Sequence, residues 1–237
     1  MPKNPEADAA HVKGAGILRE SEKAYAALSS YKGTITIAST AQYANFAFEE
    51  SRQFKVFYQR PGRIRLEGRD SNGDPILIIS DGKNVVDLSE PDPKVETDVA
   101  EILFANAGVS LGATETLPGI LLELKWSRQT FFLPRGKLLT AFASKAKFEG
   151  TTTVDGHKCH RVVCEREVET WTFYIDTESH LIRRIEETAS IKQKQAQKRH
   201  GGGGVSGKIQ STTLTQTFKI QEVNKDLDSS LFKIPKK

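Results

Sequence analysis

The chain has 237 residues, enough for one large all-β domain or two small ones. Hydrophobic residues make up 38% of it, so the core is lean, and 34 basic against 30 acidic residues leave a net charge of only +4. This small, well-mixed charge argues against nucleic-acid binding, which normally requires clustered Lys and Arg beside stacking aromatics. No stretch approaches the roughly 18 apolar residues that a membrane-spanning helix needs.

An amphipathic helix is predicted from about Asp8 to Tyr31. Apolar residues recur there every three or four positions, as one face of a helix requires, and several alanines favour helix formation. Gly33 follows the last turn, where a C-terminal glycine is common. We expect the helix to pack its stripe on a sheet through Ile17, Leu18, Ser21, Tyr25, Leu28 and Tyr31.

The stretch from Arg52 to Leu88 predicts four short strands joined by tight turns. Apolar residues alternate with polar ones along most of it, which places them on one face of a strand. The first turn contains Pro61, which has no N–H to give to a sheet. The last contains Asp81 and Gly82, a strong hairpin signal. The result is an antiparallel meander with one apolar and one charged face.

The chain changes character after this meander. Three short apolar segments within residues 98–144 are predicted to be helices; Gly108 follows the first as an end signal, and Pro118 opens the second. We interpret residues 98–144 as a helical insertion that lies as a lid across the apolar face of the sheet.

Strands return after this block and continue to the C-terminus. Apolar residues alternate at Trp171, Phe173 and Ile175. Residues 192–207 are basic and glycine-rich, which predicts a flexible hairpin tip. The order of helix, strands, helical block and strands indicates a single α+β domain over residues 8–235, built on one long, curved antiparallel sheet.

Residues that would indicate catalysis or metal binding are sparse. His157 and His160 are close in sequence, but three positions along a strand put them on opposite faces, and zinc requires four convergent ligands. Cys159 and Cys164 would lie roughly 16 Å apart in a strand, too far for a disulfide. The common nucleophile, zinc-protease and phosphate-loop motifs are missing from the sequence. We therefore expect no metal, no cofactor and no enzymatic activity.

Three short motifs and their order along the chain are its most specific features. They are QRPG at 59–62, ISDGK at 79–83, and YID at 174–176 followed by LIRRIE at 181–186. The first two are similar to Lys-Arg-Pro-Asn and Val-Ser-Asp-Gly-Lys of a known family. With the helical block after the meander, the chain resembles the lipoprotein-carrier fold of the bacterial cell envelope, that of LolA and its receptor and sensor relatives. The resemblance covers most of the chain.

This resemblance implies an incomplete β-barrel whose helices form a lid over an apolar cavity that takes acyl chains. It assigns control of lid closure to Arg60, the arginine of the Arg-Pro turn. It also implies a periplasmic or envelope protein. The N-terminus contains no apolar segment typical of a signal peptide, so on this reading such a peptide has been removed, although a native cytoplasmic start would look the same.

Two functions remain open from the sequence. In the first, the protein is a monomeric carrier or sensor that holds a lipid acyl chain or a lipidated protein between sheet and lid; a filled core without a cavity is its plain alternative. In the second, it is a scaffold that binds another envelope protein through a sheet edge or the basic tip. For the first, the residues expected to contact the ligand are Phe54, Val56, Tyr58, Ile64, Leu66, Leu77, Ile79, Leu121, Leu122, Trp126, Trp171, Phe173 and Ile175.

Overall fold

The computed structural model describes residues 5–43, 46–69, 73–97, 139–166, 169–190 and 209–235. Within them, one α-helix and two short 3-10 helices accompany eleven strands, so the described fold is mostly β. The elements are α1 (Pro5–Ala26), β1 (Ser30–Tyr43), β2 (Ala47–Gln59), β3 (Arg63–Arg69), β4 (Pro75–Asp81), β5 (Val85–Asp87), β6 (Val95–Glu96), η2 (Thr140–Lys145), β7 (Ala146–Val154), β8 (His157–Glu165), β9 (Glu169–Asp176), β10 (Ile182–Ser190), β11 (Ile209–Val223) and η4 (Ser229–Phe232).

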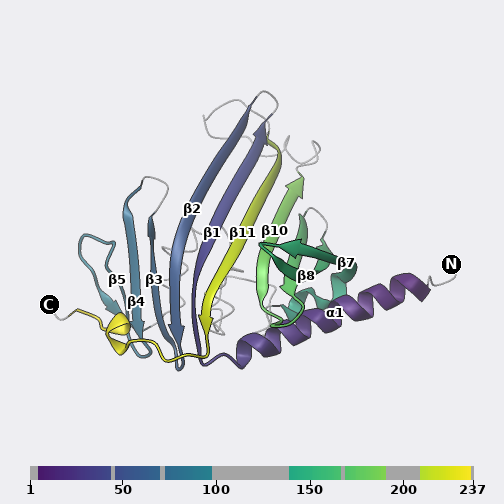
Figure 1. Ribbon diagram of the computed structural model, residues 1–237. Coiled ribbons are helices and arrows are strands. Elements are labelled where there is room, and N and C mark those ends of the chain that lie inside the picture. Colours follow the sequence, from purple (N-terminus) through teal and green to yellow (C-terminus); the bar gives the residue numbers. More distant parts are fainter. Residues whose placement is uncertain are drawn as a thin grey trace.

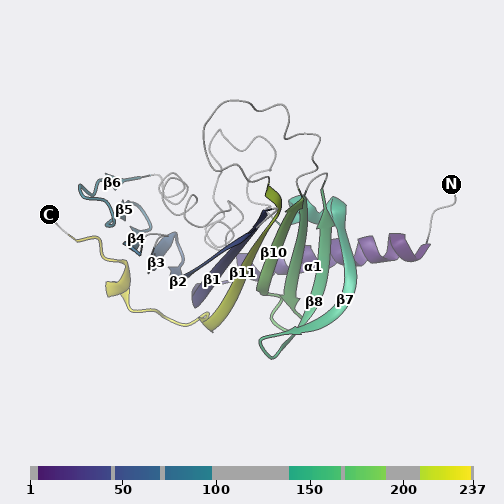
Figure 2. The same cartoon turned by 90° about the horizontal axis from the view of Figure 1, so that it is seen from above.

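All eleven strands form one antiparallel sheet in the order β6-β5-β4-β3-β2-β1-β11-β10-β9-β8-β7. It consists of two meanders, β1 to β6 and β7 to β11, which join where β1 pairs with β11 (Figure 1). Seen from above, the sheet bends into an open arch (Figure 2). The edge strands β6 and β7 are not hydrogen-bonded to each other, which confirms the predicted curved antiparallel sheet as an open, incomplete barrel.

The two faces of the sheet differ in chemistry. Strand register places Val56 opposite Gly33 and Leu66, and Phe173 opposite Val162. Because directly opposed residues point to the same side of a sheet, these apolar side chains share one face, which we call the inner face. It contributes most of the hydrophobic core. The opposite, outer face of β2 and β3 carries charged residues, as the alternation predicted.

The N-terminal helix is present, but it ends earlier than predicted. α1 spans Pro5–Ala26, and a short turn leads into β1. Tyr31, expected as the last residue of the helical stripe, lies in β1 opposite Tyr58. Gly33, expected to end the helix, lies at a register shift in β1, where a Cβ would be 2.6 Å from the Tyr31 hydroxyl oxygen. Tyr31 and Gly33 pair with β2 on one side and β11 on the other, and this tertiary pairing outweighs the helical spacing of the local sequence.

α1 lies against the edge strand β7, across one end of the sheet (Figure 1). Its His11 Nδ1 is 2.8 Å from the carbonyl oxygen of Ala146, and its Lys13 Nζ lies 3.7 Å from the centre of the Phe148 ring. Gly14 allows this approach, because a Cβ there would come within 2.8 Å of the Phe148 backbone nitrogen. The helix therefore covers the start of an edge that would otherwise be open to another chain.

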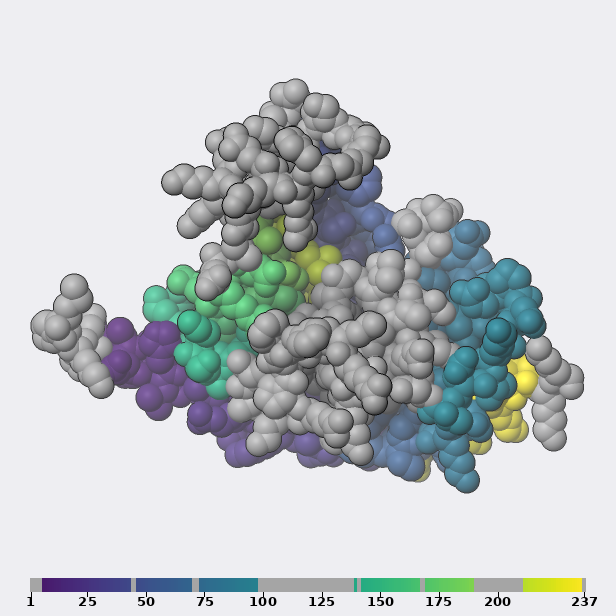
Figure 3. Space-filling view, turned by 180° about the vertical axis from the view of Figure 1, so that it is seen from behind, coloured from purple at the N-terminus to yellow at the C-terminus, as the bar shows by residue number. Residues whose placement is uncertain are grey.

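The C-terminal segment packs on the other end of the molecule. η4 contacts β3 and β4, and Phe232 is buried there. The guanidinium of Arg65, an outer-face residue of β3, donates a hydrogen bond to the carbonyl oxygen of Leu231. From behind, α1 and the β7–β9 strands form one surface, and the C-terminal segment lies beside β4 and β5 at the opposite end (Figure 3).

Two predicted features fall on residues that the structure does not describe. Residues 98–138 of the expected helical lid lie outside the described ranges, and so does the expected hairpin tip at 192–207. The end of the predicted lid is described, and it forms the 3-10 helix η2 rather than an α-helix.

Candidate ligand-binding face

The inner face of the central strands is an unbroken apolar surface. Phe54, Ile35 and Phe218 lie in register across β2, β1 and β11, and none is more than 1% exposed. On the β3–β4 side the surface continues through Leu66 and Ile78, which are also buried. All five belong to one hydrophobic cluster. This face is therefore apolar from β4 to β11.

Most of the residues expected to contact a ligand are brought together on this face. They come from β2, β3 and β9, and each is at most 2% exposed. They are Phe54, Val56, Tyr58, Ile64, Leu66, Trp171, Phe173 and Ile175.

Leu77 and Ile79, also expected at the site, lie on the outer face instead. In the pairing of β3 with β4, Ile78 is opposite Leu66, and side chains alternate along the strand. The inner-face residues of β4 are therefore Ile76 and Ile78. A continuous apolar run contains no alternation from which the facing of a strand can be read.

The remaining three expected residues, Leu121, Leu122 and Trp126, lie outside the described residues. Conversely, the structure adds Ile35, Ile37 and Phe218, which were not among the expected site residues. The two isoleucines alternate visibly in the sequence. The same signal is present in β11, where Leu214, Phe218 and Ile220 alternate with threonines and a lysine.

The described helices that pack on this face lie over its β7–β9 side. Phe142 of η2 places its ring centre 5.4 Å from that of Trp171 and 5.1 Å from that of Phe173. α1 packs against η2, β7 and β8. Among the described residues, the principal helix contacts with β3 and β4 come from η4, which Arg65 ties to the outer face. The half of the inner face over β1–β5 therefore has no principal helix contact within the described ranges.

Polar side chains follow the apolar surface toward the β1–β2 turn. Arg52 Nε is 2.7 Å from Glu50 Oε1. In the same row as Glu50, Ser39 and Glu187 stand on either side of Leu214. The inner face is therefore apolar near α1 and increasingly polar toward the β1–β2 turn, a division that suits an amphipathic molecule.

Arg60, expected to control a lid, contacts the end of α1. Its Nε donates to the carbonyl oxygen of Leu28, and its Nη2 donates to that of Ala26, both at 2.7 Å. A guanidinium at the C-terminus of a helix satisfies carbonyls that lack intrahelical partners and complements the helix dipole. Arg60 thus ties the β2–β3 turn to α1. Its role in lid closure stays a prediction, because residues 98–138 are not described.

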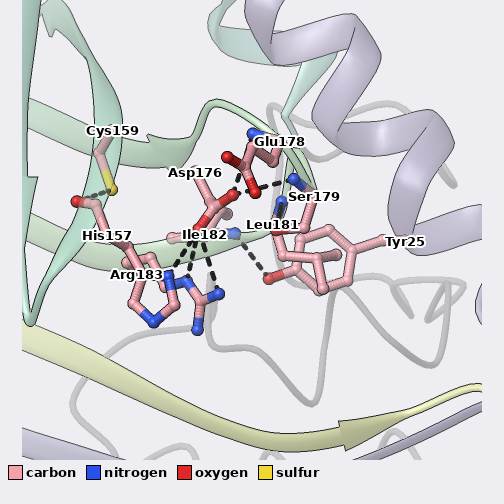
Figure 4. Close-up of polar contacts among 9 residues, drawn as sticks. All are labelled: Tyr25, His157, Cys159, Asp176, Glu178, Ser179, Leu181, Ile182 and Arg183. Carbon is pink, nitrogen blue, oxygen red and sulfur yellow. Dashed lines mark hydrogen bonds and ion pairs between the residues drawn. The ribbon is translucent and has the colours of Figure 1, made fainter.

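A polar network occupies the β9–β10 turn, close to Tyr25 of α1 (Figure 4). Asp176 Oδ2 lies 3.1 Å from the Arg183 guanidinium and 3.2 Å from His157 Nδ1, while Oδ1 accepts the backbone N–H groups of Glu178 and Ser179. Burial opposes ionisation of Asp176, but the N–H donors and Arg183 outweigh it and lower the pKa of the carboxyl.

The two cysteines are buried in β8 with free thiols. Cys159 and Cys164 point to opposite faces of the strand. Burial raises the pKa of both thiols, that of Cys164 to about 12, so they stay protonated at neutral pH. Across the part of the chain that the structure describes, no three His, Cys, Asp or Glu side chains converge as metal ligands. None of the helices in that part has the length and apolar character to cross a membrane.

Comparison with known proteins gives similarity in structure only. Neither a family model nor a curated protein sequence matches the chain. Among solved structures, the Mycobacterium tuberculosis lipoprotein LppX matches with a TM-score of 0.49 and 10% identity over 92% of this chain and 98% of that one. The chain is similar in fold to this lipoprotein. LprF from Mycobacterium bovis matches at 0.45 and 13% over 91% and 95%.

A LolA superfamily protein from Nitrosomonas europaea also matches, with a TM-score of 0.32 and 8% identity over 93% of this chain and 97% of that one. This is the superfamily that the three sequence motifs resemble. These identities and scores describe a likeness of fold, and the function has to be argued from the residues of this chain.

Proposed function

We propose that this protein carries an apolar ligand on its inner face, either the acyl chain of a lipid or a lipidated protein, as a carrier or sensor in the cell envelope. The observation that carries the proposal is the apolar row Phe54, Ile35 and Phe218 across the middle of the open sheet. The protein binds as a monomer and performs no chemistry on the ligand.

Burial of an acyl chain on an apolar face supplies enough free energy for binding. Each buried methylene contributes about 0.8 kcal/mol, so about ten methylenes contribute roughly 8 kcal/mol, which corresponds to micromolar affinity before ordering costs. An acyl chain therefore needs no charged recognition group to bind. In this proposal Leu121, Leu122 and Trp126 cover the chain, and Arg60 controls their closure.

Titration with a pyrene-labelled hexadecanoic ester, followed by fluorescence, tests the proposal. Leu214→Arg places a charge on the inner face of β11, and Thr213→Arg places the same charge on its outer face. We expect Leu214→Arg to weaken probe binding at least tenfold and Thr213→Arg to leave it unchanged. Glu187 is opposite Leu214, so the new arginine has an acidic neighbour and the fold should tolerate it.

Equal probe binding by both variants, or none by the wild type, would refute a ligand site on this face. Mass spectrometry of the folded protein provides a second readout, since a carrier purified under mild conditions should retain a lipid.

Binding to another protein is the second candidate function, and the far end of β7 favours it. Thr151, Thr152 and Thr153 are exposed on this edge strand, and a strand edge offers unpaired backbone groups to an extended peptide. If this edge is the binding surface, Thr152→Pro should abolish capture of an envelope partner while leaving binding of the probe intact.

A further inference from the structure

Gln216 is a buried polar residue on the inner face of the sheet. It lies on the inner face of β11, between Ile37 of β1 and Ile185 of β10. Its exposed fraction is 1%, and the two isoleucines beside it are 5% and 1% exposed. The sheet thus surrounds one side-chain amide with hydrocarbon.

Within the described ranges, neither end of this amide has a hydrogen-bond partner. Both Nε2 and Oε1 of Gln216 are buried without a partner among the described residues. Burying an amide without partners is costly, and nearly all buried polar side chains in folded proteins have at least one. An amide in this condition can accept a hydrogen-bonding partner from a ligand that lies on the inner face.

The position of Gln216 shows which part of a ligand it would meet. One row toward α1 lie Phe218 and Ile35, which are fully apolar surroundings. One row toward the β1–β2 turn lie Ser39 and Glu187. Gln216 therefore stands at the boundary between the apolar and the polar zones of the inner face.

We propose that Gln216 binds the linkage between the acyl chain and the head group of an ester-linked lipid. Its amide N–H donates to the ester carbonyl, and its amide oxygen accepts from a neighbouring hydroxyl of a glycerol head group. The chain lies over Phe218 toward α1, and the head group points toward the β1–β2 turn. This inference rests on the proposed ligand-binding function and specifies its ligand class.

The charges nearest the site favour a neutral ester over a free fatty acid. Glu187 lies one row away on the adjacent strand β10. Arg52 lies in the row of Gln216, but two strands away on β2, and it pairs with Glu50 of the next row. A carboxylate placed at Gln216 would approach acidic groups in surroundings of low polarity, which is unfavourable. An ester has the same chain and carbonyl without the charge.

Three pyrene-labelled probes with the same chain length test the inference: the glycerol monoester, the free acid and the plain alkane. The wild type should bind the monoester most tightly. Gln216→Leu should remove the preference for the monoester over the alkane, a change of about fivefold for each of the two neutral hydrogen bonds. Gln221→Leu, the same substitution at an exposed position of β11, should leave the preference unchanged.

Folding of the variant provides a readout that does not depend on a ligand. Without ligand, Gln216→Leu should raise the melting temperature relative to the wild type, because it replaces an unpartnered amide with a hydrocarbon of similar size. A lower melting temperature would show that the amide has a partner in the protein and would overturn the inference.

The binding outcomes separate the inference from the function on which it rests. If the wild type binds all three probes and Gln216→Leu leaves their relative affinities unchanged, Gln216 does not recognise the linkage, although the ligand site remains. If the wild type prefers the free acid, the ligand class is wrong. If it binds no probe, the proposed function and the inference both fail.

Discussion

Single residues fix the β9–β10 turn and its contact with α1. Asp176 binds two backbone N–H groups of its own turn and the guanidinium of Arg183, while the Tyr25 hydroxyl of α1 accepts the N–H of Ile182 (Figure 4). These contacts lie in the β9–β10 turn and at the start of β10, away from the polar zone of the inner face. They contribute to stability rather than to ligand recognition, and both can be tested by one-atom changes.

Replacing Asp176 with Asn should weaken the fold most strongly near neutral pH. The pKa of Asp176 is lowered in the folded protein, so its carboxylate stabilises the fold above the unfolded-state pKa of about 3.9 and loses that effect as the pH falls through the lower folded-state pKa. We expect a loss of about 1.5–3 kcal/mol at pH 7, which shrinks below pH 4. Urea unfolding from pH 2 to pH 7 measures it.

Asp155→Asn serves as the matched control for this experiment. Asp155 is exposed in a neighbouring hairpin turn, where its φ of 48° suits Asn. Its pH profile should run parallel to that of the wild type. If the Asp176→Asn curve also runs parallel, the carboxylate contributes no pH-dependent stability.

Tyr25→Phe should destabilise the protein although it removes only one oxygen atom. The Ile182 N–H, 3.1 Å from that oxygen, lies in a buried position at a register shift of β10 and would lose its acceptor. An unsatisfied buried donor costs about 1–3 kcal/mol. Tyr174→Phe, which removes a half-buried hydroxyl bonded to Glu186, should cost less than about 1 kcal/mol. Chemical denaturation compares the two, and equal losses would contradict this account.

At the scale of elements, two nearby glycines of α1 have opposite surroundings. Gly14 touches the backbone of β7, whereas a Cβ on Gly16 would meet nothing within 4 Å. Helix propensity alone favours alanine at either position by about 1 kcal/mol. Substituting alanine at Gly16 therefore tests helix propensity alone, whereas the same substitution at Gly14 also tests packing against β7.

Gly14→Ala should lower the free energy of unfolding by about 1–3 kcal/mol, because the added methyl group must push α1 away from the β7 edge. Gly16→Ala should raise it by about 0.5–1 kcal/mol. Thermal unfolding of the two variants decides the matter: a shift of both in the same direction would mean that α1 does not depend on close contact with β7.

The same scale shows what can be read from the sequence and what cannot. Alternation and turn residues were sufficient for the β2–β5 meander and for the inner facing of Phe54 and Phe173, because both signals are local. The facing of Ile79 was wrong, since a uniform apolar run has no phase. The predicted end of α1 was wrong, because Tyr31 pairs with neighbouring strands as part of β1. Gln216 was not predicted, because its neighbours come from β1 and β10, and the pairing of β1 with β11 is remote in sequence.

At the scale of the whole molecule, the centre of the sheet should be its most stable part. β1 and β11 pair with each other and each has a further partner on its other side, whereas β6 has only two residues at an edge. Native-state hydrogen exchange should therefore be slowest in the middle of β1 and β11 and fast in β6 and at Thr151–Thr153 of β7. Faster exchange in β1 than in β7 would contradict the strand order as the source of stability.

The joining of β1 to β11 also has a consequence for how the protein is made. On the ribosome, β1 to β6 emerge first, and β1 then has one neighbour and one bare edge until the last strand has been translated. α1 also lacks its packing partner β7 at this stage, because β7 belongs to the second meander. The nascent chain thus exposes the unpaired edge of β1 until β11 has been translated.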